Sequence, residues 1–339
     1  MKNSKLKICD SQVYPGERAN LALPLPELYS CAPMYMPIRV FHGKESGATL
    51  VVLSTTQGFE LNGIEIINRL TADSRIDNLK GTLITIPVLN VFALSHYPKT
   101  SPSGRDLTSC FPGDESGSYG QRIAYTLTHE ILKKADGCIE LQTGELNHEI
   151  LPQIYCDLKA QRSRHLARHF QAPVVTDVEV KPNSLRETLD SLHIPFLVYE
   201  AGEALRFNET AISVGVQGIL NTMKALEMID DATSPHEPIK PVFSQNDDWL
   251  LSPKSGIFHT DISLGEMITT GQNIGSISDP LSPDFAEKIK CPFDGIVVGI
   301  NNHPLIYEGQ RIVKVAAFLD NDKAELTIEE WEEAQPDEE

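Results

Sequence analysis

The stretch from Val51 to Leu70, VVLSTTQGFELNGIEIINRL, decides the fold of this chain. It begins within an apolar run, LVVLSTT at 50–56, that predicts a buried β-strand. It ends in GIEIINRL at 63–70, where apolar residues recur at helical spacing. A short polar turn with Gln57, Gly58 and Glu60 joins the two. The stretch therefore predicts a strand that runs through a polar elbow into a helix.

The same alternation of strand and helix patterns continues between residues 46 and 230. Buried strands are predicted for TLITIPVLNVF (82–92), GCIELQTG (137–144) and PFLVYEAGE (195–203), and helices for YGQRIAYTLTHEILKKA (119–135) and VQGILNTMKALEMI (216–229). This alternation indicates an α/β domain with a mixed or largely parallel sheet. Ligands bind such sheets at the carboxyl ends of the strands. Because Gln57, Gln142 and Glu200 each follow a strand-like run, we expect them to meet at one sheet edge.

The remaining segments divide the chain further. Residues 1–45 predict extended segments, and the proline-rich, polar residues 231–246 predict a linker. Residues 247–318 predict a small β-barrel-like domain, in which SPKSGIF (252–258) is echoed by CPFDGIV (291–297). This weak repeat resembles a biotinyl/lipoyl hammerhead barrel, but no Met-Lys turn that could carry such a cofactor is present. Residues 319–339 form an acidic tail, which we expect to be solvated or a short exposed helix.

Composition limits the partners and the compartment. The chain has 29 basic and 47 acidic residues, a net charge of −18, which argues against nucleic acid or an anionic membrane as the main partner. The six cysteines show no CxxC spacing, which favours reduced thiols. The first residues lack the apolar core of a signal peptide, so we expect a cytoplasmic protein. The sequence leaves the oligomeric state open.

Four motifs resemble those of the succinylglutamate desuccinylase/aspartoacylase family, which are relatives of the zinc carboxypeptidases. The family patterns His-Gly-Asp-Glu-x-Asn-Gly, Arg-Asp-Leu-Asn-Arg-x-Phe-Pro-Gly, Asp-Leu-His-Thr-Gly and Glu-x-Gly correspond to QGFELNG (57–63), RDLTSCFPG (105–113), ELQTG (140–144) and EAG (200–202). The resemblance covers nearly the whole chain, including the β-domain. It implies a zinc-carboxypeptidase-like α/β domain followed by a small C-terminal β-barrel-like domain.

The resemblance also implies roles for single residues. Gln57, Glu60 and Gln142 stand at the positions where the family binds zinc through two histidines and a glutamate. Glu200 stands at the position of the general base, which takes a proton from water and passes it to the leaving amine. Arg105, Thr108 and Ser109 fall in the motif that grips the substrate carboxylate, and His148 lies near a substrate-binding position.

The motif residues that shape the backbone match the family, whereas most of those that would bind zinc or substrate are replaced. Both zinc histidines are replaced by Gln57 and Gln142, whose amide oxygens are much weaker zinc donors than imidazole nitrogen. An oxygen-only set with Glu60 suits a hard, weakly held cation. Thr108 and Ser109 replace the family's Asn-Arg pair and remove its carboxylate-binding fork. We therefore expect zinc to be absent or weakly bound.

Each retained residue also has a purely structural interpretation. Arg105 can be a surface arginine, Glu200 a polar residue at a strand end, and Glu60 a carboxylate favoured by a helix N-terminus. Three histidines are candidate substitute metal ligands: His129 lies within a predicted helix, His96 and His148 lie in loop-like segments, and His148 is only six residues after Gln142. His148 is therefore the best substitute.

Two functional hypotheses follow. In the first, the chain is a catalytically inactive or weakened relative that retains its pocket to bind a protein or a small molecule, such as an N-acyl amino acid or another anion. In the second, it is an active metal-dependent hydrolase of N-acyl amino acid amides with an atypical metal site. The sequence names neither the ligand nor the pathway.

Overall fold

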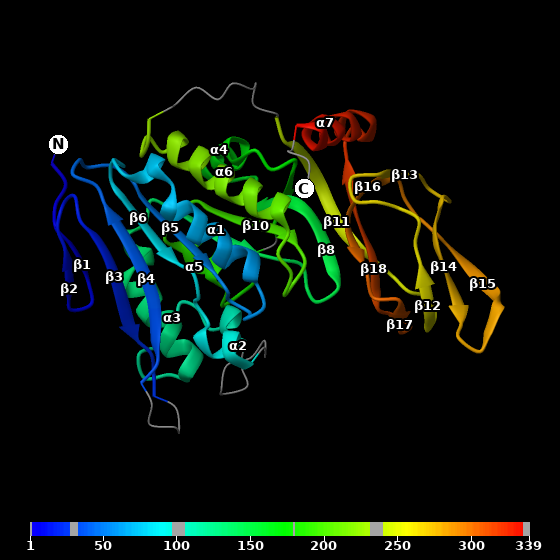
Figure 1. Cartoon of the computed structure of the whole chain (residues 1–339), viewed down its shortest axis with the longest axis horizontal. Helices are drawn as coiled ribbons and strands as arrows, with labels where there is room; N and C mark the ends of the chain where they lie inside the picture. The colour runs from blue at the N-terminus through cyan, green and yellow to red at the C-terminus, as the bar shows by residue number, and fades with distance from the viewer. Residues whose placement is uncertain (1, 28–32, 97–105, 179, 231–239, 335–339) are drawn as a thin grey trace.

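The computed structural model describes residues 2–27, 33–96, 106–178, 180–230 and 240–334 (Figure 1). Within these residues, no helix combines the length and the apolar character needed to cross a membrane. Two hairpin strands, β1 (Leu6–Ile8) and β2 (Ser11–Val13), open the chain and pair with each other.

A mixed sheet of twelve strands spans the described part of the chain. Its strands are β3 (Arg18–Pro24), β4 (Tyr35–His42), β5 (Thr49–Ser54), β6 (Thr82–Ile86), β7 (Gly137–Gln142), β8 (His148–Cys156), β9 (Val174–Asp177), β10 (Phe196–Gly202), β11 (Val242–Leu251), β13 (Met267–Ile268), β16 (Gly295–Asn301) and β18 (Arg311–Phe318). They are ordered β3-β4-β6-β5-β7-β10-β8-β9-β11-β18-β16-β13. The central pairs β6–β5, β5–β7 and β7–β10 are parallel, so their carboxyl ends share one edge.

Helices cover both faces of the central sheet. The helices are α1 (Leu61–Ala72), α2 (Val91–His96), α3 (Tyr119–Glu130), α4 (Gln161–Phe170), α5 (Leu185–Ser191), α6 (Glu209–Ala225) and α7 (Asn321–Glu333), with 3-10 turns at Ser74–Ile76, Leu107–Ser109 and Leu132–Lys134. Side chains of α1, α4 and α6 form one apolar core with the sheet, and those of α3 and α5 form another on the opposite face (Figure 1). The expected α/β domain with a mixed sheet is therefore confirmed.

The C-terminal β-region is joined to the α/β sheet by hydrogen-bonded strands. Strand β11 pairs with β9, β18 pairs with β11, β16 pairs with β18, and β16 also pairs with β8. Because β8 pairs with β9, five strands close into a ring, which is the barrel-like part of the fold. A separate four-stranded sheet contains β12 (Gly256–His259), β14 (Asn273–Asp279), β15 (Ser282–Lys290) and β17 (Leu305–Ile306) and lies at the far end of the molecule (Figure 1).

Three segments differ from the sequence-based expectation. Residues 242–246, which were predicted as part of a linker, belong to β11, because Val242, Phe243 and Ser244 pair with β9. Residues 91 and 92, predicted as strand, begin helix α2, since the strand β6 ends before Pro87. Proline lacks the backbone N–H that would continue the ladder.

The acidic tail forms a helix, which is one of its two expected forms, but the helix is docked and not merely exposed. Helix α7 begins after Asp320, whose side chain accepts a hydrogen bond from the Lys323 backbone N–H. Its apolar side Ala324, Ile328 and Trp331 is buried against the core shared with β16 and β18. The acidic residues occupy the remaining face, so the tail is an amphipathic helix and not a freely solvated segment.

Candidate functional site

The polar elbow after β5 holds the first group of candidate residues. Gly58 has a φ of +88°, and a side chain there would lie 2.4 Å from the Ala93 backbone, so glycine is required. The turn brings the Gln57 backbone N–H to the Glu60 carboxylate, which accepts a hydrogen bond at 3.1 Å. Glu60 is the N-cap residue of α1 and is only 1% exposed. The elbow thus fixes a buried carboxylate beside Gln57.

The sheet edge holds the second group. Gln142 ends β7, and its register partner in β10 is Glu200. On the other side of β10, Glu200 pairs with Gln153 of β8. Register partners point to the same sheet face, so Gln142, Glu200 and Gln153 stand side by side across three strands.

One cavity of about 290 Å³ brings the two groups together. Gln57, Glu60, Gln142, His148 and Glu200 all line it. The opposite wall comes from the C-terminal region, through Asp247, Asp248, Trp249, Arg311 and Lys314. The Trp249 ring packs edge-on against the His148 ring, with 4.9 Å between ring centroids. The cavity is therefore built from both parts of the chain.

The three residues expected from the sequence to occupy metal positions, Gln57, Glu60 and Gln142, do not fit zinc. The Gln142 Nε2 donates a hydrogen bond of 2.8 Å to the Glu140 Oε1, so this amide is engaged within the protein. Two amides and one carboxylate offer no nitrogen or sulfur ligand. Among the described residues, moreover, no three histidine, cysteine, aspartate or glutamate side chains are arranged to hold a metal ion. We therefore derive no chemical step through a metal.

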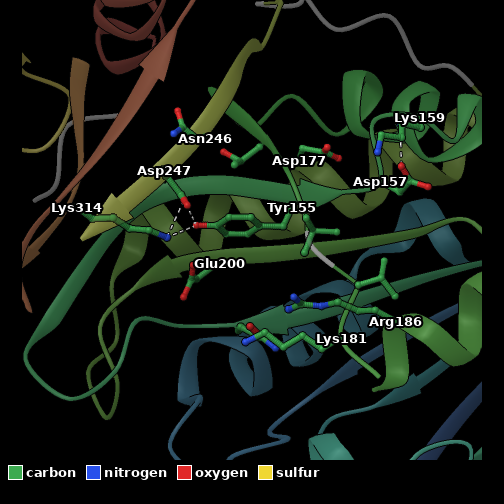
Figure 2. A pocket seen from close by; sticks show the side chains of 14 residues that line it. Tyr155, Asp157, Lys159, Asp177, Lys181, Arg186, Glu200, Asn246, Asp247 and Lys314 are labelled. Atoms are coloured by element: carbon green, nitrogen blue, oxygen red, sulfur yellow. Dashed lines mark hydrogen bonds and ion pairs between the residues drawn. The ribbon is translucent and has the colours of Figure 1, made fainter. Parts of the chain in front are cut away.

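A buried charge network lies next to Glu200 (Figure 2). The Lys314 Nζ lies 2.7 Å from the Asp247 Oδ2 and also donates a hydrogen bond to the Tyr155 hydroxyl. The Tyr155 hydroxyl in turn donates to the Asp247 Oδ2 at 2.6 Å. The three residues come from β18, β11 and β8, so this network crosses the five-stranded ring.

Burial dominates the electrostatics of the two glutamates. Desolvation raises the pKa of Glu60 to about 8, and the nearby charges of Glu140 and Glu200 contribute to the shift. Desolvation also raises the pKa of Glu200, while the positive charge of Lys314 opposes this effect. The sheet edge therefore concentrates more carboxylates than its neighbouring cations neutralise.

A second, larger cavity of about 890 Å³ adjoins the first. The two share Gln142, Glu200, Asp247 and Lys314. The larger cavity is lined in addition by Lys159, Lys181 and Arg186 (Figure 2). The Arg186 Nε lies 4.0 Å from the Glu140 Oε2. Through the four shared residues, the two cavities adjoin at the sheet edge.

The other sequence-based candidates are placed as follows. Arg105 lies outside the described residues. Thr108 and Ser109 form a 3-10 turn held by Asp106, and neither is among the residues that line the two cavities. His129 stacks on Tyr125 within α3, and its Nδ1 contacts the Tyr125 carbonyl. The side chain of His96 is outside the described part. Of the three histidines, the structure brings His148 to the cavity.

Several residues of the site were not predicted from the sequence, among them Glu140, Tyr155, Asp247 and Lys314. Glu140 could have been found, because it lies two residues before Gln142 in a strand and therefore on the same face. No local sequence pattern marks Tyr155, Asp247 or Lys314 as residues of a site. They lie far apart in the chain and meet only because β8, β11 and β18 close the ring.

The profile of the succinylglutamate desuccinylase/aspartoacylase catalytic domain matches residues 46–226. The N-alpha-acetyl-L-2,4-diaminobutyric acid deacetylase of Halomonas elongata is 23% identical over 299 residues, which are 84% of this chain and 86% of that protein.

Solved structures show the same fold over most of the chain. A succinylglutamate desuccinylase/aspartoacylase from Rhodobacter sphaeroides has a TM-score of 0.79 at 23% identity, over 89% of this chain and 96% of that one. The product-bound ectoine utilization protein EutE (DoeB) of Ruegeria pomeroyi has a TM-score of 0.78 at 19% identity, over 88% and 95% of the two chains. With a family profile that spans more than half of its length, this chain belongs to the succinylglutamate desuccinylase/aspartoacylase family.

Proposed function

We propose that this chain is a catalytically inactive or weakened member of its family that retains the pocket to bind a small molecule, an N-acyl amino acid or another anion. The observation that carries this proposal is the donor set at the family's metal positions. Gln57 and Gln142 supply amides, and the Gln142 amide nitrogen is bonded to Glu140. The cavity itself persists at about 290 Å³, together with the larger space beside it.

The test measures metal content and hydrolysis on the purified full-length chain. The protein is dialysed against zinc, then against metal-free buffer, and analysed for its elements. An assay with N-acyl amino acids follows, with and without a chelator. We expect less than stoichiometric zinc and no metal-dependent turnover. One tightly held zinc per chain, with hydrolysis that the chelator abolishes, would overturn the proposal.

The alternative is an active metal-dependent hydrolase with an atypical site. One observation favours it: His148 lines the same cavity as Gln57, Glu60 and Gln142. If His148 supplied the imidazole, His148→Ala would abolish both zinc binding and turnover of the wild-type chain. If the chain is instead a metal-free binding protein, His148→Ala would leave its affinity for the ligand unchanged.

A further inference from the structure

The orientation of the Gln142 amide is fixed by its neighbour. The Glu140 Oε1 accepts hydrogen bonds from the Gln142 Nε2 at 2.8 Å and from the Thr56 hydroxyl at 3.3 Å. A carboxylate oxygen accepts hydrogen bonds, so the nitrogen of the amide must face Glu140. The Gln142 Oε1 is therefore the atom left for the cavity, and it has no hydrogen-bond donor within the described part of the chain.

Two further acceptors belong to the elbow. Glu60 uses one carboxylate oxygen to accept from the Gln57 backbone. The side-chain amide of Gln57 makes no hydrogen bond to any described residue, and both residues line the cavity. Replacing two histidines by glutamines has thus turned a nitrogen-ligand site into a group of oxygen acceptors. A primary ammonium group carries three N–H donors and a positive charge, which suits three such acceptors.

The charge balance of the site points the same way. Glu60 and Glu200 line the smaller cavity, and Glu140 contacts the Gln142 amide there. Lys314 is already paired with Asp247 at 2.7 Å, and Arg186 lies 4.0 Å from Glu140. These two cations face four carboxylates. Two cations do not balance four carboxylates, so a cation bound among them is favoured.

A separate observation indicates an unfilled polar position beside Glu200. Gln153 is completely buried, and neither its Oε1 nor its Nε2 has a hydrogen-bond partner among the described residues. It stands opposite Glu200 in the strand register and so points to the same sheet face. Buried amides in folded proteins are almost always hydrogen-bonded. An ordered water or a polar group of a ligand beside Glu200 would satisfy this amide.

We propose that the former metal position is a binding site for the primary ammonium group of a free amino acid, which donates hydrogen bonds to the Gln57 and Gln142 side-chain oxygens and to Glu60. The inference rests on the proposed function, because a bound zinc would occupy the same place. It narrows the ligand from N-acyl amino acids and other anions to zwitterions with an unacylated amine.

The larger cavity accommodates the rest of such a ligand. It shares Gln142 and Glu200 with the smaller cavity, and Lys181 and Arg186 line it farther along. A carboxylate attached to the bound amine can therefore approach cationic side chains without leaving the cavity. Asp157 and Asp177 line the larger cavity as well, so its charges are mixed and the carboxylate is expected near Lys181 and Arg186.

The test compares ligands that differ only at the amine. Wild-type chain in buffer with a chelator is screened by thermal shift against the proteinogenic L-amino acids and L-2,4-diaminobutyric acid. Each compound that raises Tm is measured by calorimetry beside its N-acetyl form and the corresponding α-hydroxy acid. We expect the free amino acid to bind at least about tenfold more tightly than either derivative. If the derivatives bind equally well, or if no free amine binds, the ammonium site is refuted.

Protein variants locate the effect. Methionine matches glutamine in length and lacks the acceptor, so Gln57→Met and Gln142→Met should each weaken binding of the free amino acid by about tenfold and leave the α-hydroxy acid unaffected. Gln12→Met changes an exposed glutamine on β2 and serves as the control. If Gln57→Met and Gln142→Met bound the free amino acid as tightly as Gln12→Met does, the ammonium site would be refuted.

The two proposals fail in different ways. N-acyl amino acids that bind the zinc-free chain as tightly as free ones would refute the ammonium site while preserving the proposed function. Stoichiometric zinc with metal-dependent hydrolysis would refute both.

Discussion

At the residue scale, Gln57 and Gln142 determine which ligands the smaller cavity can bind. Glutamine reaches about as far as histidine but presents an amide oxygen and nitrogen in place of an imidazole. At position 142 the nitrogen is already used by Glu140. The same cavity therefore offers hard oxygen acceptors, which bind zinc weakly and cationic N–H groups well.

Restoring the imidazoles should restore zinc binding before catalysis. We expect the double variant Gln57→His and Gln142→His to hold one zinc per chain, measured by titration and elemental analysis. Gln12→His, on the exposed face of β2, is the control. Hydrolysis of N-acyl amino acids should stay poor until Thr108→Asn and Ser109→Arg are added. A double variant that binds no zinc would mean that the geometry of the site has drifted.

The buried carboxyl of Glu60 makes stability depend on pH. Its pKa rises from 4.5 to about 8 on folding, so the folded chain holds a proton that the unfolded chain has released. The contribution of Glu60 to the free energy of unfolding is complete below the unfolded pKa of 4.5. It is lost as pH rises through the folded pKa of about 8, by about 1 kcal/mol per pH unit. Urea unfolding across this range should show the slope in wild type and a flatter profile in Glu60→Gln. Glu330→Gln, on the exposed face of α7, should keep the wild-type slope.

The Lys314–Asp247 pair should be energetically sensitive to removal of one partner. Their side chains are 11% and 15% exposed, so Lys314→Met leaves a buried carboxylate without its cation. We expect a loss of about 3 kcal/mol in the free energy of unfolding, part of which Asp247→Leu should recover in the double variant. Lys80→Met removes an exposed ion pair with Asp230 and should cost less than about 1 kcal/mol. Similar losses for both lysines would contradict this account.

At the element scale, helix α7 converts an acidic tail into part of the fold. Trp331 is 4% exposed and packs into the core shared with the sheet, whereas Leu326 on the same helix is 60% exposed. Trp331→Ala should therefore lower the free energy of unfolding by about 3 kcal/mol, and Leu326→Ala should change it by less than about 0.5 kcal/mol. Chemical denaturation of both variants measures the difference. A harmless Trp331→Ala would show that the helix is not docked in solution.

At the scale of the whole molecule, the closed ring of strands joins the two parts of the chain. We propose that residues 247–318 narrow access to the pocket, since Asp247, Trp249 and Lys314 form one of its walls. The α/β sheet continues into this region through the β9–β11 and β8–β16 pairs. The two parts therefore share backbone hydrogen bonds as well as the charge network around Tyr155.

Such a shared sheet should unfold as one unit. Both tryptophans, Trp249 and Trp331, lie in the C-terminal part, whereas most helix belongs to the α/β part. We expect thermal unfolding followed by tryptophan fluorescence and by far-ultraviolet circular dichroism to give coincident transitions. Two separate transitions would indicate independent domains and contradict the role assigned to the ring.

The sequence by itself determined the strand, elbow and helix around Gln57, the central α/β pattern and the family. These features follow from local periodicity and from short motifs, in which neighbouring residues carry the information. Gln57, Glu60, Gln142 and Glu200 could be predicted to share one sheet edge because parallel strands end together.

Only the tertiary structure decided the rest of the site. The network of Tyr155, Asp247 and Lys314 forms across strands that are distant in sequence, and no local pattern encodes such a meeting. The docking of α7 was hidden by its acidic composition, since only its three buried side chains reveal the apolar face. The orientation of the Gln142 amide also depends on a tertiary contact. The Glu140 carboxylate accepts a hydrogen bond from the Gln142 nitrogen, and this contact determines which end of the amide is the nitrogen.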